Sequence, residues 1–248
     1  MDESKNTAII MRDAEHGDTE AKCILGMMYL DGHGVPQSDA KALEWFAQAA
    51  EEGNADAQFY LGVMYYEGRC VPQNYAKAVE WYSRAIEQNH AESQFNIGWL
   101  YAKGHGLPQD DVKAAEWIAK AAEQGDADAQ SDLGVMYYEG RGVPQDDTKA
   151  FEWLSKAAAQ GIATSQANLG EMYEKGRGVP QDYAKAAEYY AMAAEQGNAF
   201  GQYDLGRMYE NGLGVPQDHA KAAEYYAMAA EQGHDDAQRN LDALSERN

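Results

Sequence analysis

The sequence predicts an all-α fold, a right-handed α/α superhelical solenoid of helix–turn–helix repeats, and three observations support this class. The pair Leu-Gly recurs in steps of 36 residues between Leu25 and Leu205, with Ile97-Gly98 filling the one gap. All six prolines obey the same step, and each is followed by Gln. Of the 24 glycines, 23 fall in four columns of this repeat, and only Gly201 stands outside them. Self-similarity at a fixed period of this length is the signature of a repeat architecture.

The repeat boundaries follow when Thr19 is counted as position 1. Six consecutive repeats then span 19–54, 55–90, 91–126, 127–162, 163–198 and 199–234. Residues 1–18 contain a match to the end of a second repeat helix, and residues 235–248 match a further first helix. We therefore expect one domain over 1–248, closed by an N-terminal capping helix in 1–18 and a C-terminal one in 235–248, because a solenoid needs a cap at each end.

Each repeat is expected to hold two helices, A and B. In the fourth repeat, helix A covers 127–139 and ends at Gly140, which suits the left-handed conformation after a helix. Helix B covers 147–160 and ends at Gly161, with Asp146 as its N-cap. The same N-cap column reads Ser38, Asn74, Asp110, Asp146, Asp182 and Asp218. In the second repeat Asn89 replaces the final glycine, and Asn is the next-best residue for a left-handed cap.

The recurrent apolar columns predict the core. Helix A supplies Leu25, Met28 and Tyr29 with their equivalents, and helix B supplies Ala42, Trp45 and Ala49, which share one helical face. We therefore expect the tryptophan and tyrosine stripe to be core. Lys41 and Glu44 recur in all six repeats and are expected on a solvated face with weak pairing.

Composition limits the partners. The formal net charge of −21 disfavours nucleic acid and anionic lipid, and favours a protein or peptide partner that is basic. No apolar run is long enough for membrane insertion. Two cysteines without a CxxC fit a reducing compartment, so a cytoplasmic location is the default, and a periplasmic or secreted one would follow if a signal peptide had been removed. A monomer is expected.

No catalytic or metal-binding pattern stands out. The histidines are scattered through turns, caps and helix starts, and the acidic residues form neither an EF-hand nor a paired-acid pattern. We expect no enzyme activity, no metal and no cofactor. Cys70 stands in a turn column that is otherwise glycine. It is either a reactive thiol or a side chain that the turn tolerates, at about 1 kcal/mol of strain if φ is positive.

With these residues, the chain resembles the Sel1-like repeat family, a relative of the tetratricopeptide repeat. The matching signature runs from Ala127 to Ala158 and reads ADAQSDLGVMYYEGRGVPQDDTKAFEWLSKAA. The resemblance implies an adaptor that assembles protein complexes, often bacterial, or an immunity-type partner. It also implies an alternative, because some cysteine-rich members are described as penicillin-binding with weak β-lactamase activity. Those carry a regular cysteine pair in each repeat, which this chain lacks; nitrocefin turnover separates the two readings.

If the phasing of that family transfers, helices A line a concave surface, and positions 2, 5, 9, 12 and 13 face it. Columns that vary there are free to specify a partner. We expect a peptide to place apolar anchors on an aromatic N-terminal half and basic residues on a charged C-terminal half. The first set is Phe59, Val63, Tyr66, Phe95, Trp99 and Tyr138, and the second is Glu171, Glu174, Tyr203, Arg207 and Glu210.

Two alternatives stay open at this point. Positions 5 and 9 could pack between neighbouring A helices and only add to the core. The regularity of repeats four to six could also mean a structural array without a specific partner.

Overall fold

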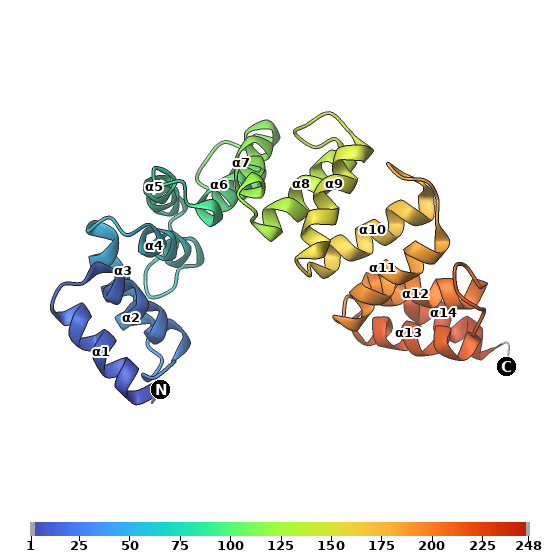
Figure 1. Cartoon of the computed structure of the whole chain (residues 1–248), viewed down its shortest axis with the longest axis horizontal. Coiled ribbons are helices and arrows are strands. Elements are labelled where there is room, and N and C mark those ends of the chain that lie inside the picture. Colours follow the sequence, from blue (N-terminus) through green and yellow to red (C-terminus); the bar gives the residue numbers. More distant parts are fainter. Residues whose placement is uncertain (1–2, 247–248) are drawn as a thin grey trace. The chain divides into compact units, whose positions relative to one another are not determined.

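The computed structural model describes residues 3–246, and the side chains of residues 5–246; residues 1–2 and 247–248 of the two expected capping segments lie outside that range. Within it the chain forms fourteen α-helices and no strand (Figure 1). The helices divide into two compact units, Met1–Gln124 (unit 1) and Gly125–Asn248 (unit 2). The all-α solenoid of helix–turn–helix repeats is thereby confirmed, and the single domain over 1–248 stays a prediction.

Unit 1 contains the first seven helices, in which A and B helices alternate after the first. They are α1 (Glu3–Glu15), α2 (Thr19–Asp31), α3 (Asp39–Glu51), α4 (Ala55–Glu67), α5 (Tyr75–Ile86), α6 (Ala91–Lys103) and α7 (Asp111–Glu123). The A helices are α2, α4 and α6. Each packs on the B helix of its own repeat, and each B helix that has a following A helix in the unit packs against it as well.

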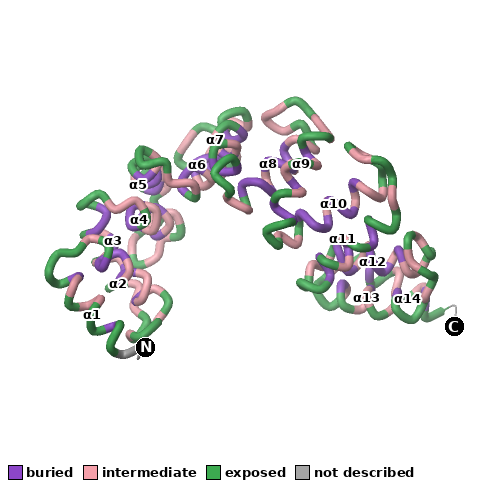
Figure 2. Tube along the Cα trace, viewed as in Figure 1, coloured by how far each residue is buried: buried purple, intermediate pink, exposed green. Residues whose placement is uncertain are grey.

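Unit 2 repeats this arrangement and closes with a final A-type helix. Its helices are α8 (Ala127–Glu139), α9 (Asp147–Ala159), α10 (Ala163–Lys175), α11 (Tyr183–Glu195), α12 (Ala199–Asn211), α13 (His219–Glu231) and α14 (Asp235–Ser245). The A helices are α8, α10 and α12, and α14 packs on α13. Buried stretches alternate with exposed helix ends and loops along every repeat (Figure 2).

The helix ends follow the punctuation of the sequence. All six predicted N-cap residues of the B helices accept a hydrogen bond from a backbone N–H of the first helical turn, which is confirmed for Ser38, Asn74, Asp110, Asp146, Asp182 and Asp218. The glycine that ends each of the six A helices is left-handed, with φ between 63° at Gly212 and 76° at Gly68. Local chemistry therefore sets where these helices begin and end.

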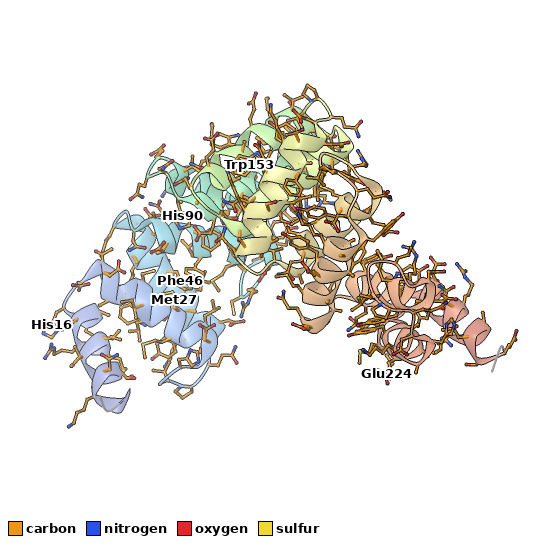
Figure 3. All side chains as sticks on the ribbon, turned by 45° about the vertical axis from the view of Figure 1, so that its right-hand side comes forward. His16, Met27, Phe46, His90, Trp153 and Glu224 are labelled. Atoms are coloured by element: carbon orange, nitrogen blue, oxygen red, sulfur yellow. The ribbon has the colours of Figure 1, made fainter. Side chains whose placement is uncertain are left out.

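The core differs from the sequence prediction in helix B. The tryptophan column is only half buried, whereas the next position along the helix is fully buried, as Phe46, Tyr82, Ile118, Leu154, Tyr190 and Tyr226. These side chains lie against the glycine of the Leu-Gly pair in helix A, which leaves room for them. Met27 packs against the cluster that contains Phe46, and both are labelled in Figure 3. The tryptophan stripe is therefore a rim of the core and not its centre.

The lysine column also differs from the expectation. Its ammonium groups lie over the tyrosine ring of helix A in the same repeat, between 4.9 Å for Lys41 on Tyr29 and 5.4 Å for Lys113 on Tyr101. The same contact recurs in all six repeats. A cation over an aromatic face is attracted by the ring quadrupole, at about 0.5–1 kcal/mol when exposed. These lysines thus cover tyrosine rings, which are half buried in five repeats and buried at Tyr29, instead of only facing solvent.

A buried glutamine at position 4 links the two helices of each repeat from the second to the sixth. Its side-chain oxygen accepts a hydrogen bond from the glutamine at position 34, as for Gln124 to Gln94 at 2.8 Å. In the first repeat both glutamines are replaced, by Lys22 and Glu52, which form an ion pair. Hydrogen bonds with Lys22 and Thr19 lower the pKa of Glu52. The exchange keeps a buried polar position satisfied, as burial requires.

Replacing Cys70 with glycine is expected to raise the free energy of unfolding by about 1 kcal/mol. Cys70 adopts a positive φ of 56°. At the equivalent Gly106, an added Cβ would lie 2.8–2.9 Å from atoms of Tyr75, so the column is crowded as well as left-handed. Urea unfolding of wild type and variant measures the difference.

Asn89→Gly is the matched control, because Asn89 also has a positive φ, of 61°. Its column has open space, as at Gly125, and its side chain bonds both Gln94 and Gln124. We expect no gain there. A destabilised Cys70→Gly protein, or an equal gain in both variants, would contradict this account of the turn.

Candidate partner-binding site

Four of the predicted binding residues meet in one pocket of unit 1. Val63 and Tyr66 come from α4, and Phe95 and Trp99 from α6. Glu67, Asn96 and the buried Tyr82 of α5 complete the lining of a cavity of about 290 Å³. The four predicted residues are half buried, so each presents part of its surface to the pocket. Spacings of four and three residues along each A helix put positions 5, 9 and 12 on this side.

Phe59 does not line that pocket. Its ring packs against Tyr60 at 5.3 Å, against Tyr82 at 6.0 Å and against His90 at 5.1 Å between centroids. His90, labelled in Figure 3, caps α6 by accepting a hydrogen bond from the backbone N–H of Ser93. Phe59 is thus a packing residue beside the site.

Position 5 as a whole is less open than predicted. Cys23, Ser131 and Ala167 at this position are buried, with 1%, 7% and 8% of their surface exposed. Position 5 lies close to the neighbouring A helix, as the hydrogen bond from Ser165 of α10 to Ser131 of α8 shows. The expectation that this column faces an open surface is wrong for these three repeats, because the A helices approach each other there.

A cluster of four aromatic rings includes two that line the unit 1 pocket, Tyr66 and Trp99. Tyr75 and His105 stack at 4.5 Å, and Tyr66 meets Trp99 edge-on at 5.8 Å. Tyr66 also contacts Tyr75, and Trp99 contacts His105. Sequence reasoning missed Tyr75 and His105, which stand in variable columns: three of the other repeats carry Asp at the first position, and three carry Arg at the second.

The consequence of those two exchanges is visible in repeats where Asp and Arg are kept. Arg69 forms a two-pronged ion pair with Asp39, and Arg177 does the same with Asp147. A guanidinium paired with a carboxylate holds two repeats together by charge. Between the second and third repeats the stacked rings of Tyr75 and His105 replace that pair, and the site becomes apolar.

Unit 2 has a second pocket at the equivalent register, 72 residues further along. Val135, Tyr138 and Glu139 of α8, Leu154 of α9, and Asn168 and Glu171 of α10 line a cavity of about 200 Å³. The hydroxyl of Tyr138 donates a hydrogen bond to Glu171 at 3.1 Å. Tyr138 and Glu171 were both predicted as site residues, and the fold brings them together.

Two of the remaining predicted residues, Glu174 and Arg207, belong to a charged network in unit 2. Arg207 donates to Asp204 at 2.7 Å and to Glu174 at 3.0 Å, and Tyr190 donates to Glu174 at 2.8 Å. Burial raises the pKa of Asp204 despite its bonds with Arg207. Burial opposes the charge of Arg207, but its bonds with Asp204 and Glu174 outweigh that effect and raise its pKa. Arg207 and Glu174 thus already satisfy each other.

Tyr203 and Glu210 are likewise engaged within unit 2. Tyr203 stacks on His234 at 4.4 Å, and the hydroxyl of Tyr226 donates to Glu210 at 2.7 Å. The charged set predicted for the C-terminal half is therefore divided. Glu171 lines a pocket, whereas Tyr203 and Glu210 make contacts within the sixth repeat, and Arg207 and Glu174 pair across the fifth and sixth repeats.

The two thiols are in opposite environments. Cys23 is buried, and its burial, followed by the charges of Asp56 and Glu20, raises its pKa to about 12. Cys70 is exposed, and both are free cysteines. Within the described part of the chain no group of three or more His, Cys, Asp or Glu residues could hold a metal ion. No described helix is both long and apolar enough to cross a membrane.

The family follows from the repeats. The model of the Sel1 repeat matches residues 19–54, 55–90, 91–126, 127–162, 163–198 and 199–234. The chain belongs to the Sel1 repeat family. Sel1 repeat proteins generally serve as scaffolds for protein–protein interactions and are typically not catalytic. The match spans the A and B helices of all six repeats, so both pockets lie within Sel1 repeats.

Solved structures with the Sel1 fold are similar to this chain. One is c5321, a protective antigen of uropathogenic Escherichia coli, at 38% identity and a TM-score of 0.88, over 97% of this chain and 52% of that one. Another is a Sel1 repeat protein of Oxalobacter formigenes, at 34% identity and a TM-score of 0.76, over 86% and 85%. This chain thus spans about half the length of c5321.

A more distant likeness shows the fold alone. The immunity protein Pa5087 of Pseudomonas aeruginosa is 23% identical, with a TM-score of 0.51, over 77% of this chain and 73% of that one. A comparison with curated protein sequences finds no match.

Proposed function

We propose that this Sel1 repeat chain is an interaction scaffold that binds a partner segment on the face of its A helices, with an apolar anchor in the unit 1 pocket. The observation that supports this is the convergence of Val63, Tyr66, Phe95 and Trp99 on one cavity of about 290 Å³. Partly exposed aromatic side chains around a cavity are the usual anchors of protein interfaces.

The composition of the pocket supports an apolar anchor over a charged one. Its lining includes Val63, Phe95 and the ring of Tyr82, and its acidic member, Glu67, lies 3.9 Å from the guanidinium of Arg69. The four-ring cluster of Tyr66, Tyr75, Trp99 and His105 holds two of the pocket walls in place. Side chains that their neighbours already hold in place lose little conformational entropy when a partner binds, which favours affinity.

The double variant Phe95→Ala/Trp99→Ala is expected to lose partner capture by about a hundredfold or more, since two anchor truncations typically cost about 2 kcal/mol or more each. The immobilised chain is incubated with a lysate of its source cell, and bound proteins are identified by mass spectrometry. A partner found with wild type is then titrated against each variant.

Tyr101→Ala/Trp117→Ala is the matched control. These two half-buried aromatic residues belong to the same unit but line a separate cavity with Val79 and Ile86. Circular dichroism checks that both double variants keep their helices. Capture that survives in the Phe95/Trp99 variant, or that is lost equally in the control, would refute the proposed site.

A further inference from the structure

The unit 2 pocket has the chemistry of a site for one cationic side chain. Val135 and Leu154 give its lining apolar side chains, and Tyr138 adds an aromatic ring. Glu139 and Glu171 bring two carboxylates, and Asn168 brings an amide. At about 200 Å³ the cavity is smaller than the roughly 300–1,000 Å³ of sites for drug-sized ligands. Its size therefore fits a single side chain better than a small-molecule substrate.

The equivalent positions in the following repeat show how the fold holds a guanidinium between two A helices. One repeat further on, Asn168 is replaced by Asp204, Glu171 by Arg207 and Tyr138 by Glu174. The Arg207 guanidinium donates to Asp204 at 2.7 Å and to Glu174 at 3.0 Å. An arginine of the chain itself thus bridges carboxylates from two A helices, α10 and α12.

The unit 2 pocket lies at the equivalent positions one repeat earlier, and its lining contains no arginine. Glu171 stands where Arg207 stands in the later repeat, and Ala167 stands where Tyr203 stands. Glutamate in place of arginine reverses the charge at that position, and alanine in place of tyrosine removes an aromatic ring. The result is a cavity whose lining includes two carboxylates. The net charge of the chain, −21, also attracts basic partners.

We propose that this pocket receives an arginine side chain of the partner protein, with its methylene groups on Val135 and Leu154 and its guanidinium at Glu139 and Glu171. The inference rests on the scaffold function proposed above and names the chemistry of a second contact. Arginine fits better than lysine, because its planar fork can bond carboxylates in pairs. The guanidinium of Arg177 already lies over the ring of Tyr138, 3.7 Å from the ring centroid, but Arg177 does not line the pocket.

Two cations of the chain compete with such an arginine, because Arg141 pairs with Glu139 at 3.3 Å and Lys175 pairs with Glu171. Lys175 stands four residues after Glu171 on α10, and 54% of its side chain is exposed. An exposed pair of this kind contributes only about 0.3–0.5 kcal/mol, so an incoming guanidinium can displace it. The proposal therefore makes opposite predictions for the two residues: removing the charge of Glu171 weakens arginine binding, and removing Lys175 strengthens it.

The test is a titration of the full chain with N-acetyl-arginine amide, followed by amide chemical shifts in two-dimensional NMR. N-acetyl-citrulline amide, which has the same shape without the charge, is titrated in parallel. Shift changes are expected at Tyr138, Glu139, Asn168 and Glu171 with the arginine probe only. Glu171→Gln is expected to weaken binding about tenfold or more, as loss of a charge-assisted hydrogen bond implies, and Lys175→Ala to tighten it about twofold.

Glu152→Gln is the matched control, since Glu152 is an exposed carboxylate of α9 outside the pocket lining. Equal binding of citrulline, shift changes elsewhere, or a Glu171→Gln protein that binds like the Glu152→Gln one would overturn the proposal. The failure would be distinguishable from failure of the scaffold function, because partner capture through Phe95 and Trp99 is measured separately in unit 1. Circular dichroism excludes unfolding as the cause of a loss.

Discussion

Replacing Arg207 with alanine is expected to lower the free energy of unfolding by about 2–3 kcal/mol. Breaking a fully buried ion pair by removing one partner costs about 3–5 kcal/mol, and Arg207 is 36% exposed, which reduces the figure. The loss arises because Glu174 and Asp204, whose side chains are 14% and 22% exposed, would keep their charges without a cation. Urea unfolding at neutral pH, followed by circular dichroism, measures it.

The pH dependence of this defect has a definite sign. Burial already raises the pKa of Asp204 above its unfolded value, so its ionisation costs stability as the pH rises through that range. Without Arg207 the pKa of Asp204 rises further, because a lowering influence is removed. The difference between wild type and Arg207→Ala should therefore shrink as the pH falls below 7, because Asp204 takes up its proton in the variant before it does so in the wild type.

Arg141→Ala serves as the control for charge removal alone. Arg141 pairs with Glu139, and their side chains are 41% and 52% exposed. An exposed pair of this kind contributes about 0–1 kcal/mol. If Arg207→Ala were as mild as Arg141→Ala, or if its defect grew at lower pH, the network around Arg207 would not carry the stability assigned to it.

Gly170→Ala is expected to destabilise the protein by up to about 2 kcal/mol, although alanine is the better helix former. A Cβ added at Gly170 would lie 2.6 Å from two ring atoms of Tyr190, which is 1% exposed and cannot move aside. Overpacking a filled core typically costs about 1–3 kcal/mol. It has to exceed the roughly 1 kcal/mol that alanine gains over glycine within a helix.

The sign of this substitution should reverse when Tyr190 is removed. In a Tyr190→Ala background the clash disappears, and Gly170→Ala should stabilise by up to about 1 kcal/mol through helix propensity. The four proteins form a double-mutant cycle, measured by urea unfolding, whose coupling energy reports the contact. A Gly170→Ala effect of the same sign in both backgrounds would show that the glycine column is not required by the aromatic column.

Much of the fold could be predicted because it depends on local backbone chemistry. The left-handed glycine at Gly140, the N-cap at Asp146 and the positive φ of Cys70 and Asn89 each follow from one residue and its neighbours. The candidate site was predicted less completely. Val63, Tyr66, Phe95 and Trp99 meet as their spacing predicts, but Tyr75 and His105 reach the cluster from a helix start and a turn.

The sequence by itself determined the repeat, its helices and their ends, because period, caps and glycines act over a few residues. Only the tertiary structure decided which of two adjacent columns fills the core. Trp153 and Leu154 point about 100° apart on one helix, and Leu154 is the buried one because Gly134 of the facing helix leaves space for it. The same holds for the site: the distance between neighbouring A helices, which no single repeat specifies, closes position 5 at Ser131 and leaves the pocket beside Tyr138 open.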